Sequence, residues 1–468
     1  MAEVDFQSPK GVSEGMECVD SSLDLITSPR KNYSIEKNMI STIYPITPLN
    51  TNSNQVFFEC PPSSYWTDLY NSYLDMTLKI VTDAGADCPA TFDESNSVAF
   101  ENLISQVLWK SIKVRIGDTS LTGSHDLMHL TSYLGVLLNF DSSARNTRLH
   151  SAGWTDVSNF DANTAHDAIA AAAPKAAVDA APDSAFKRRS KWTLGGRKKR
   201  FRTYIPHYFF ATERMLLPMC AFQVELLRNS DNFCLISNAA TLGYKIKIES
   251  LSLCLRRVVT LPSLVKSMES SLLKAEARYP LRYGYTRAIM IDRHCLRHDE
   301  ENLFLSNQIP QFCVIGFQLA SEFRGNHQSS NLKFPHHNLK TIKLIHDDQT
   351  YPSPDGYITE YNDDKTKDHL DAFLGLYQRT LRENAGLIIN YENFAQSYCL
   401  YAFYTSSDGI TGALQNDHIS APREGTVRLT ATFDPKHLNE ALVCLVYAEN
   451  DAMIYLNSLR QCTRSYEL

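Results

Sequence analysis

Apolar side chains in this sequence recur at every second position in several separate stretches, and this spacing limits the fold more than any other feature. Residues 74–81 alternate apolar with polar side chains, and residues 111–116, 222–226 and 427–433 repeat the pattern. A period of two places the apolar side chains on one face of a β-strand. The sequence therefore predicts antiparallel sheets, each with one buried face and one face toward solvent.

Residues 244–257 begin with the same alternation and then change its parity. Ile246 and Ile248 share one parity, whereas Leu251 and Leu253 share the other. A shift of one residue would turn the apolar side chains to the opposite face of the strand. This stretch therefore predicts a β-bulge, or a bend between two strands.

Three stretches have the apolar spacing of a helix. They are residues 124–139 with Ser124 as the expected N-cap, residues 261–278 with Pro262 near the start, and residues 368–384. Strands are expected before and after each helix without regular alternation, which disfavours a parallel α/β fold. No short repeat is present that would indicate a propeller or a solenoid.

Length and cysteine usage limit the organisation of the chain. At 468 residues it exceeds what one hydrophobic core serves, so two domains of about 200 residues are expected. The 11 Cys residues are scattered singly, which favours reduced thiols over a disulfide framework or a zinc site. No apolar run approaches the roughly 20 residues that span a bilayer, and the first residues lack the order of a signal peptide. We therefore expect a soluble intracellular protein.

Two segments differ in composition from the rest of the chain. Residues 1–35 are rich in Ser, Asp and Glu with little periodicity, which predicts an arm that orders only against a partner. Residues 141–200 contain an Ala-rich stretch that Pro174 and Pro182 interrupt. We interpret 141–200 as a long insertion from the first β domain that builds little core.

A basic run ends this insertion. Its nine cations, with no acid among them, are Lys187, Arg188, Arg189, Lys191, Arg197, Lys198, Lys199, Arg200 and Arg202. Without these nine, 37 of the 46 Lys and Arg residues remain against 52 Asp and Glu. A protein whose main partner is a phosphate backbone spreads its cations over a whole face. The run is therefore a local feature on an acidic body.

The sequence predicts no catalytic, cofactor-binding or metal site. It contains no G-x-x-x-x-G-K-[ST] loop, no H-E-x-x-H helix and no G-x-S-x-G elbow. The side chains that invite a metal-site hypothesis are His294, His298, Asp299, His336, His337, His346, Asp347 and Asp348. We interpret them as parts of turns, because they stand among turn-forming residues and adjacent His336 and His337 would face opposite sides of a strand. Cys313 is interpreted as a buried small hydrophobe rather than a nucleophile.

Six stretches carry a more specific pattern through their order and spacing. They are residues 216–237, 244–287, 302–326, 338–352, 390–408 and 425–457, followed by a tail at 464–466. The motif residues within them are Arg228, Asn229, Ser230, Asp231, Phe233, Tyr279, Pro280, Pro310, Phe323 and Gly325. Taken together, the stretches resemble the major capsid protein of Polinton/Maverick elements and the related adintoviruses. That family often has Asn-Pro-Phe where this chain has Leu332 and Lys333 between Asn331 and Phe334.

This resemblance implies an all-β chain made of two antiparallel eight-stranded jelly rolls, a fold that viral capsid domains commonly use. The first roll is expected at 36–262, a connecting helix at 263–278, and the second roll with the C-terminal tail at 279–468. The alternating strands, the few helices and a length sufficient for two cores agree with this expectation.

The resemblance also implies a function in self-assembly. Three chains would present six similar barrels and tile an icosahedral shell around a double-stranded DNA genome. The implied partners are two further copies in a homotrimer, neighbouring capsomers, and penton and minor capsid proteins. The protein would not be an enzyme, would need no cofactor, and would be located in the virion capsid after synthesis in the host cytoplasm, with the nucleus as one assembly site. The alternatives are a jelly-roll attachment or receptor-binding protein that does not tile, a minor capsid component, and an enzyme on a β-sandwich.

For a capsid protein, three interpretations of the basic run stay open. In the first interpretation, the run is a solvated loop, or a loop that pairs with acidic surface on a neighbouring subunit. In the second interpretation, the run is a nuclear import signal, since the cluster of Lys and Arg is short. In the third interpretation, the run contacts the packaged genome on the capsid interior, where DNA phosphates attract cations.

Overall fold

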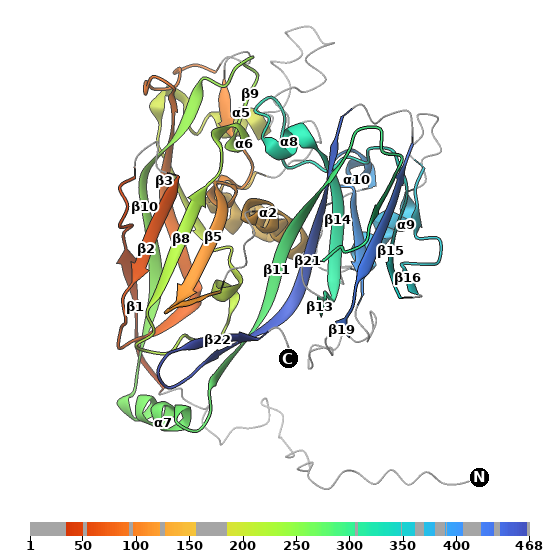
Figure 1. Ribbon diagram of the computed structural model, residues 1–468. Helices are drawn as coiled ribbons and strands as arrows, with labels where there is room; N and C mark the ends of the chain where they lie inside the picture. The colour runs from red at the N-terminus through yellow and green to blue at the C-terminus, as the bar shows by residue number, and fades with distance from the viewer. Residues whose placement is uncertain are drawn as a thin grey trace, which may run out of the picture.

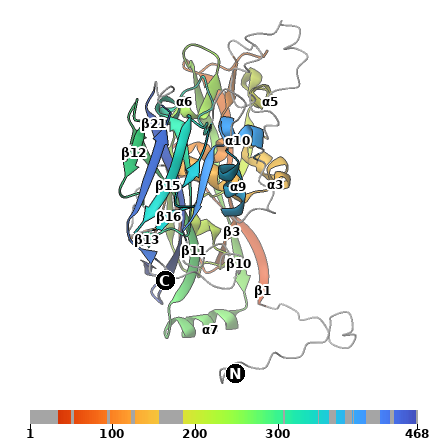
Figure 2. The same cartoon turned by 90° about the vertical axis from the view of Figure 1, so that its right-hand side faces the viewer.

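The computed structural model describes most of the chain (Figures 1 and 2). The described residues are 34–49, 54–92, 97–121, 127–155, 185–304, 308–347, 349–360, 369–379, 389, 391–405, 423–434 and 440–465. Nearly all of the expected arm, the Ala-rich stretch at 156–184, Ser124 and Asp348 lie outside these ranges.

The first half of the chain forms a barrel of two four-stranded antiparallel sheets. Their strand orders are β1-β10-β3-β7 and β2-β8-β5-β6. The strands are β1 (Ile35–Ile43), β2 (Gln55–Cys60), β3 (Trp66–Thr82), β5 (Trp109–Ile116), β6 (Thr119–Ser120), β7 (Lys199–Tyr204), β8 (Phe222–Arg228) and β10 (Tyr244–Thr260). Alternation along these strands follows the expected pattern, since β8 buries every second residue from Phe222 to Arg228.

The second half forms a barrel with the corresponding two sheets. Their strand orders are β11-β21-β14-β18 and β12-β20-β15-β16, with β22 added beside β21 and β17 beside β15. The strands are β11 (Ala277–Ile291), β12 (Arg297–Glu300), β14 (Phe312–Leu319), β15 (Leu339–His346), β16 (Gln349–Tyr351), β17 (Tyr357–Ile358), β18 (Leu400–Tyr404), β20 (Val427–Phe433), β21 (Leu442–Leu456) and β22 (Cys462–Ser465).

The two barrels have the same topology. In each, the first of the eight main strands pairs with the last, which pairs with the third, and the second pairs with the seventh. This order, in which the chain crosses between two facing sheets, defines a jelly roll. The prediction of two antiparallel eight-stranded jelly rolls is therefore confirmed.

Shorter elements fill the connections. Two small ladders join β4 (Val98–Phe100) to β9 (Leu235–Ser237) and β13 (Gln308–Ile309) to β19 (Arg423–Glu424). The helices are α1 (Ile104–Val107), α2 (Met128–Asn139), α3 (Ser142–Asn146), η1 (Arg148–Ala152), α5 (Ala185–Ser190), η3 (Leu194–Gly196), η4 (Tyr208–Ala211), α6 (Asp231–Cys234), α7 (Pro262–Leu272), α8 (Ala320–Arg324), α9 (Leu370–Arg379) and α10 (Tyr391–Ser397). Among the described residues, no helix has the length and apolar content needed to cross a membrane.

The predicted irregularity in 244–257 is confirmed as a bulge. Strand β10 is continuous, but its register against β3 shifts between Ile248 and Ser250. The extra residue restores the apolar side chains to the buried face, so Ile248 and Leu251 are both buried although their parities differ.

Two sequence expectations need correction. The connecting helix α7 ends at Leu272 rather than 278, because Ala277 already pairs with Leu456 in β11. The described parts of 141–200 contribute to the core, which contradicts the expectation of little core: Trp154 is 3 % exposed and Phe186 is 3 % exposed. Large side chains at the two edges of the insertion pack inward. The expectation was based on the Ala-rich composition of the centre of the insertion, which does not predict the burial of side chains at its edges.

Candidate functional site: the contact between the two barrels

Helix α2 lies between the barrels and contacts both (Figure 1). It packs on β5 of the first barrel and on β11 of the second. The Thr131 hydroxyl of α2 donates a hydrogen bond of 2.9 Å to the Thr286 hydroxyl of β11, and Thr286 is only 1 % exposed. The main buried cluster consequently runs through both barrels, whereas the sequence had indicated two separate cores.

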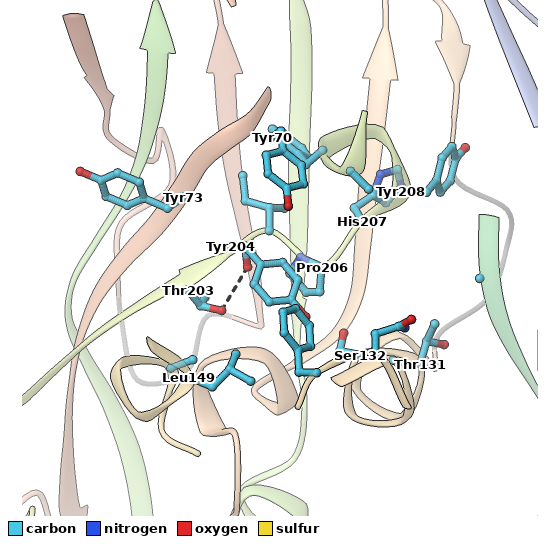
Figure 3. Close-up of a pocket in the computed structure, with 18 of the residues that line it drawn as sticks. Tyr70, Tyr73, Thr131, Ser132, Leu149, Thr203, Tyr204, Pro206, His207 and Tyr208 are labelled. Carbon is cyan, nitrogen blue, oxygen red and sulfur yellow. Dashed lines mark hydrogen bonds between the residues drawn. The ribbon is translucent and has the colours of Figure 1, made fainter. Parts of the chain in front are cut away.

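A cavity of about 520 Å³ opens beside α2 (Figure 3). The first barrel supplies most of its wall, including Tyr204 and His207, and the second barrel adds Arg282, Gly284 and Tyr447. The backbone N–H of Phe209 donates to Nδ1 of His207 at 3.2 Å, so this ring nitrogen is already engaged. The residues that line the cavity include no Asp, Glu or Cys. The cavity therefore lacks a carboxylate or thiol for acid–base or nucleophilic catalysis.

A loop of the second barrel inserts into the first barrel through Asn331, which is fully buried. Its side-chain amide donates to the carbonyl of Phe233 at 3.1 Å, and its side-chain oxygen accepts from the N–H of Asn326 at 2.8 Å. Gly325 has φ +105°, and a Cβ there would lie 3.0 Å from the backbone nitrogen of Phe233. Glycine is therefore required at 325 both by its backbone conformation and by the close approach of the other barrel.

Glu101 of the first barrel accepts hydrogen bonds from the same loop. It is 0 % exposed, and its carboxylate accepts from the N–H of Asn331 at 3.1 Å and from the Ser330 hydroxyl at 3.3 Å. Burial raises the pKa of Glu101, while the nearby Arg189 guanidinium and these hydrogen bonds oppose that shift. Burial lowers the pKa of Arg189, which is also 0 % exposed. A buried carboxyl group that several donors hold in place ties the two barrels to one relative orientation.

The motif at 228–231 fixes the end of β8. Arg228 is 8 % exposed, and its guanidinium donates to Asp231 at 2.5 Å and to the carbonyl of Ile246 at 2.8 Å. The same Asp231 oxygen accepts from the N–H of Ile246 at 3.1 Å. The N–H of Asn229 donates to the carbonyl of Leu108 at 2.8 Å, while the carbonyl of Ser230 accepts from the N–H of Phe233 at 3.1 Å. This network positions the α6 backbone that Asn331 reaches.

The other motif residues lie in the second barrel or at its boundary with the first. The Tyr279 hydroxyl in β11 donates to the carbonyl of Met215 in the first barrel at 3.2 Å. Pro280 lies in the same strand opposite Met453. Pro310 precedes β14, and its carbonyl accepts from the Thr405 hydroxyl. Phe323 of α8 packs against the core.

Most of the basic run lies in regular structure, because residues 185–190 form α5 and residues 199–204 form β7, while Lys191, Arg197 and Lys198 lie exposed in the connection between them. Arg200 donates two hydrogen bonds of 2.8 and 2.6 Å to Asp75 of β3, and Arg202 donates two more, of 3.3 and 3.0 Å. The hydrogen bonds from Arg200 and Arg202 hold the pKa of Asp75 below its ordinary value. Lys198 lies 2.9 Å from Glu249 and, with Lys247, lowers the pKa of Glu249 to about 2.

The remaining cations of the run have different surroundings. Lys187 lies over the ring of Phe92 at 5.8 Å, and Lys199 lies over the ring of Trp192 at 5.2 Å. Arg189 is the buried residue beside Glu101. Arg188 and Lys191 line a second cavity, and Arg197 follows η3. Much of the run therefore holds the first barrel together through contacts within the chain.

The residues of the metal-site hypothesis are dispersed. Asp299 accepts from Arg297 at 2.8 Å and from the Thr430 hydroxyl at 2.7 Å, and His298 lies 3.9 Å from Glu300 in the same strand. Burial lowers the pKa of His337 to about 4. Nδ1 of His346 lies 3.2 Å from the carbonyl of Thr426. His294, with φ +63°, stands in the turn before β12, and His336 precedes β15.

Two further observations concern metals and thiols. Within the ranges that the structure describes, no group of three His, Cys, Asp or Glu is arranged to hold a metal ion. Cys313 is fully buried, and burial raises the pKa of its thiol well above the ordinary value. A thiol in this environment stays protonated and is a poor nucleophile, in agreement with the sequence-based interpretation.

Comparison with known proteins finds similarity in structure alone. No family model matches, and no curated protein matches by sequence. A chain of the Sputnik virophage structure is similar with a TM-score of 0.61 at 11 % identity, over 97 % of this chain and 93 % of that one. The mavirus major capsid protein is similar with a TM-score of 0.54 at 10 % identity, over 98 % of this chain and 97 % of that one. The Faustovirus major capsid protein is similar with a TM-score of 0.53 at 9 % identity, over 92 % of each chain. The chain therefore has the double jelly-roll fold of viral major capsid proteins.

Sequence reasoning missed the residues that join the barrels. Glu101 and Asn331 are isolated polar residues in the sequence, and their burial depends on a contact between segments more than 200 residues apart. The signal that could have found Asn331 was its place in the departure from the family pattern at 331–334. Thr131 gave no signal, because a Thr on a helix face is ordinary.

Proposed function

We propose that this chain is a major capsid protein that assembles as trimers and tiles an icosahedral shell around a double-stranded DNA genome. The observation that carries the proposal is that one jelly-roll topology occurs twice, side by side, in a single chain. The similarity in fold extends over nearly the full length of the mavirus and Faustovirus major capsid proteins. The sequence resemblance to Polinton/Maverick and adintovirus capsid proteins favours that lineage.

The geometry suits this role because two equivalent barrels per chain turn three chains into six similar blocks. A threefold ring of six barrels has a nearly hexagonal outline, and such an outline tiles a surface with six neighbours. Partners of the trimer are then neighbouring capsomers, together with penton and minor capsid proteins. The junction at Glu101 and Asn331 serves this function by fixing the relative orientation of the two barrels. In this role the protein is structural and performs no catalysis.

The basic run has a narrower role in this proposal. Arg200, Arg202 and Lys198 are paired with acids of their own sheet, which supports a structural role for that half of the run. Arg188 and Lys191, beside the second cavity, are the better candidates for a nuclear import signal or a contact with packaged DNA. The capsid protein would then be made in the host cytoplasm and act in the virion.

The test is to purify the chain from nuclease-treated extract, measure its mass by light scattering, and image each peak in negative stain. A species of three times the 52.9 kDa chain mass, or closed shells, supports the proposal. A stable monomer at every concentration contradicts it, and so does a discrete oligomer that never tiles even with its minor proteins added.

A further inference from the structure

The second cavity, of about 440 Å³, has a cationic lining. Arg145 of α3, Arg188 of α5 and Lys191 line it, together with His150 of η1. None of the described residues that line this cavity is an Asp or a Glu. Its volume is in the range of small-molecule sites, about 300–1,000 Å³. A cavity with charges of one sign favours a ligand of the opposite sign, so this lining favours an anion.

Two buried polar groups of the same cavity have no partner. Trp154 is 3 % exposed and Thr155 is 5 % exposed, and both line the cavity. Within the described part of the chain, neither the indole N–H of Trp154 nor the hydroxyl of Thr155 has a hydrogen-bond partner. A buried polar group costs free energy unless it is hydrogen-bonded. Each of the two groups can donate one hydrogen bond, so the cavity suits a ligand that is rich in acceptor oxygens.

The backbone that carries these two groups is fixed on the first barrel. The N–H of Thr155 donates to the side-chain oxygen of Asn102 at 2.9 Å, and the side-chain amide of Asn102 donates to the carbonyl of Thr155 at 3.4 Å. Asn102 is only 1 % exposed. Nδ1 of His150 lies 3.2 Å from the carbonyl of Trp154. The donors are therefore held in place before a ligand binds, which lowers the entropic cost of binding.

The cations of the cavity lie at different depths. Arg188 and Lys191 are exposed, whereas Arg145 is 2 % exposed. The Arg145 guanidinium donates to the carbonyl of Leu137 and lies over the ring of Trp154, 5.3 Å from its centroid. A ligand that contacts all three cations must therefore carry negative charge at its buried end and at its exposed end.

Linked phosphate groups meet this requirement better than other anions do. Each phosphate carries charge and several acceptor oxygens, which guanidinium and ammonium groups bind through strong hydrogen bonds. A single carboxylate or phosphate would occupy only part of a cavity of about 440 Å³. Duplex DNA carries its phosphates on a continuous backbone that lies along a surface. It can therefore reach the exposed Arg188 and Lys191 but not the buried Arg145.

We propose that the second cavity binds a small molecule that carries two or more linked phosphate groups. Arg188 and Lys191 bind its outer phosphate, while Arg145, Trp154 and Thr155 donate to its inner one. Thr155 precedes the Ala-rich stretch and Arg188 follows it, so the ligand also ties together the two edges of the insertion. The inference goes beyond the proposed capsid function and does not rest on it.

The test measures the binding of inorganic triphosphate to the full chain by isothermal titration calorimetry, in buffer without divalent metal ions. The wild type is expected to bind triphosphate about tenfold more tightly than orthophosphate, because triphosphate adds charge-assisted hydrogen bonds. The double variant Arg188→Ala/Lys191→Ala is expected to bind triphosphate about tenfold more weakly than the wild type. The matched control is Arg197→Ala/Lys198→Ala, which removes two exposed cations of the same basic run that do not line the cavity.

Trp154→Phe tests whether the ligand enters the cavity. This substitution removes the indole N–H and keeps an aromatic ring, and about tenfold weaker binding is expected. Thr155→Val removes the hydroxyl at nearly constant shape and is expected to weaken binding about threefold. Thermal midpoints show which variants fold, and Thr155→Val takes the place of Trp154→Phe if that variant does not fold.

Three results would overturn the inference. The first is a folded wild type that binds no triphosphate, including the case in which it binds short duplex DNA through Arg188 and Lys191 instead. The second is a control variant that weakens binding as much as Arg188→Ala/Lys191→Ala does. The third is unchanged binding by folded Trp154→Phe and Thr155→Val, which would place the anion outside the cavity. Binding does not require assembly, so the capsid proposal survives each of these results.

Discussion

Strands β1 and β11 occupy the same place in two copies of one fold, yet their surroundings differ. The first barrel covers β11, where Thr286 is 1 % exposed and hydrogen-bonds to α2. Nothing in the described part of the chain covers the outer side of Ile40 on β1, which is 60 % exposed. The difference shows that topology alone does not decide what a strand exposes. Its position in the chain decides it, because only the second barrel has another barrel before it.

The contact between the barrels has a polar part as well as an apolar one. The contact within the chain adds a buried polar network around Glu101 and Asn331 to its apolar packing. A polar network with strict geometry fixes one relative orientation of the two barrels. The predictions below perturb the contact within the chain first.

The largest effect is expected from Asn331→Leu. The substitution removes the amide that donates to two carbonyl groups of α6, and it leaves the buried carbonyl of Phe233 without this donor. We expect a loss of about 4 kcal/mol in stability, seen as a lower thermal midpoint by scanning calorimetry. Asn302→Leu, at an exposed position, is the control. An unchanged midpoint for Asn331→Leu would show that the loop does not join the barrels as described.

A smaller effect is expected in acid from His129 on α2. Burial, with the Lys110 charge nearby, lowers the pKa of His129 to about 3, and its ring packs edge-on against Phe233. The unfolded chain binds this proton near pH 6.5, so the stabilising contribution is fully present above that pH and is lost as pH falls.

Between pH 6.5 and 4 this loss should reach about 3 kcal/mol in the wild type. His129→Leu should remove that part of the pH dependence, which thermal midpoints measured at half-unit intervals will show. Parallel curves for wild type and variant would contradict the assignment.

A still smaller effect is expected from the Thr131–Thr286 hydrogen bond. Thr131→Val and Thr286→Val, alone and together, form a double-mutant cycle with an expected coupling of about 1 kcal/mol. Chemical denaturation measures the four free energies of unfolding, and exposed Thr463→Val serves as the control. Strictly additive effects would mean that the two hydroxyls do not stabilise the contact.

The smallest effect is expected from Asp75→Asn in the first barrel. The two guanidinium groups that it binds, on Arg200 and Arg202, are 67 % and 50 % exposed, so solvent weakens the pairs. We expect a loss of about 0.5 kcal/mol at low salt and less at 0.5 M salt. A loss of several kcal/mol that persists in high salt would show a buried role for the pair.

The sequence predicted the fold where local periodicity reports on it. The alternating stretches became β3, β5, β8, β10 and β20, and the parity change became the bulge after Ile248. Prediction from the sequence failed where the burial of a residue depends on contacts with distant segments of the chain. Trp154 and Phe186 gave no sign of joining the core, and the basic run gave no sign that Asp75 lies on the adjacent strand. Long-range pairing decides these contacts, and one sequence contains no local record of it.

The most direct test of the account is a cryo-electron microscopy reconstruction of the assembled wild-type protein. The account predicts three chains in a closed ring of six barrels, with Glu101 of the first barrel against Asn331 of the second barrel in each chain. A discrete oligomer that lacks six barrels around a threefold axis, or barrels that do not meet at Glu101 and Asn331, would contradict it.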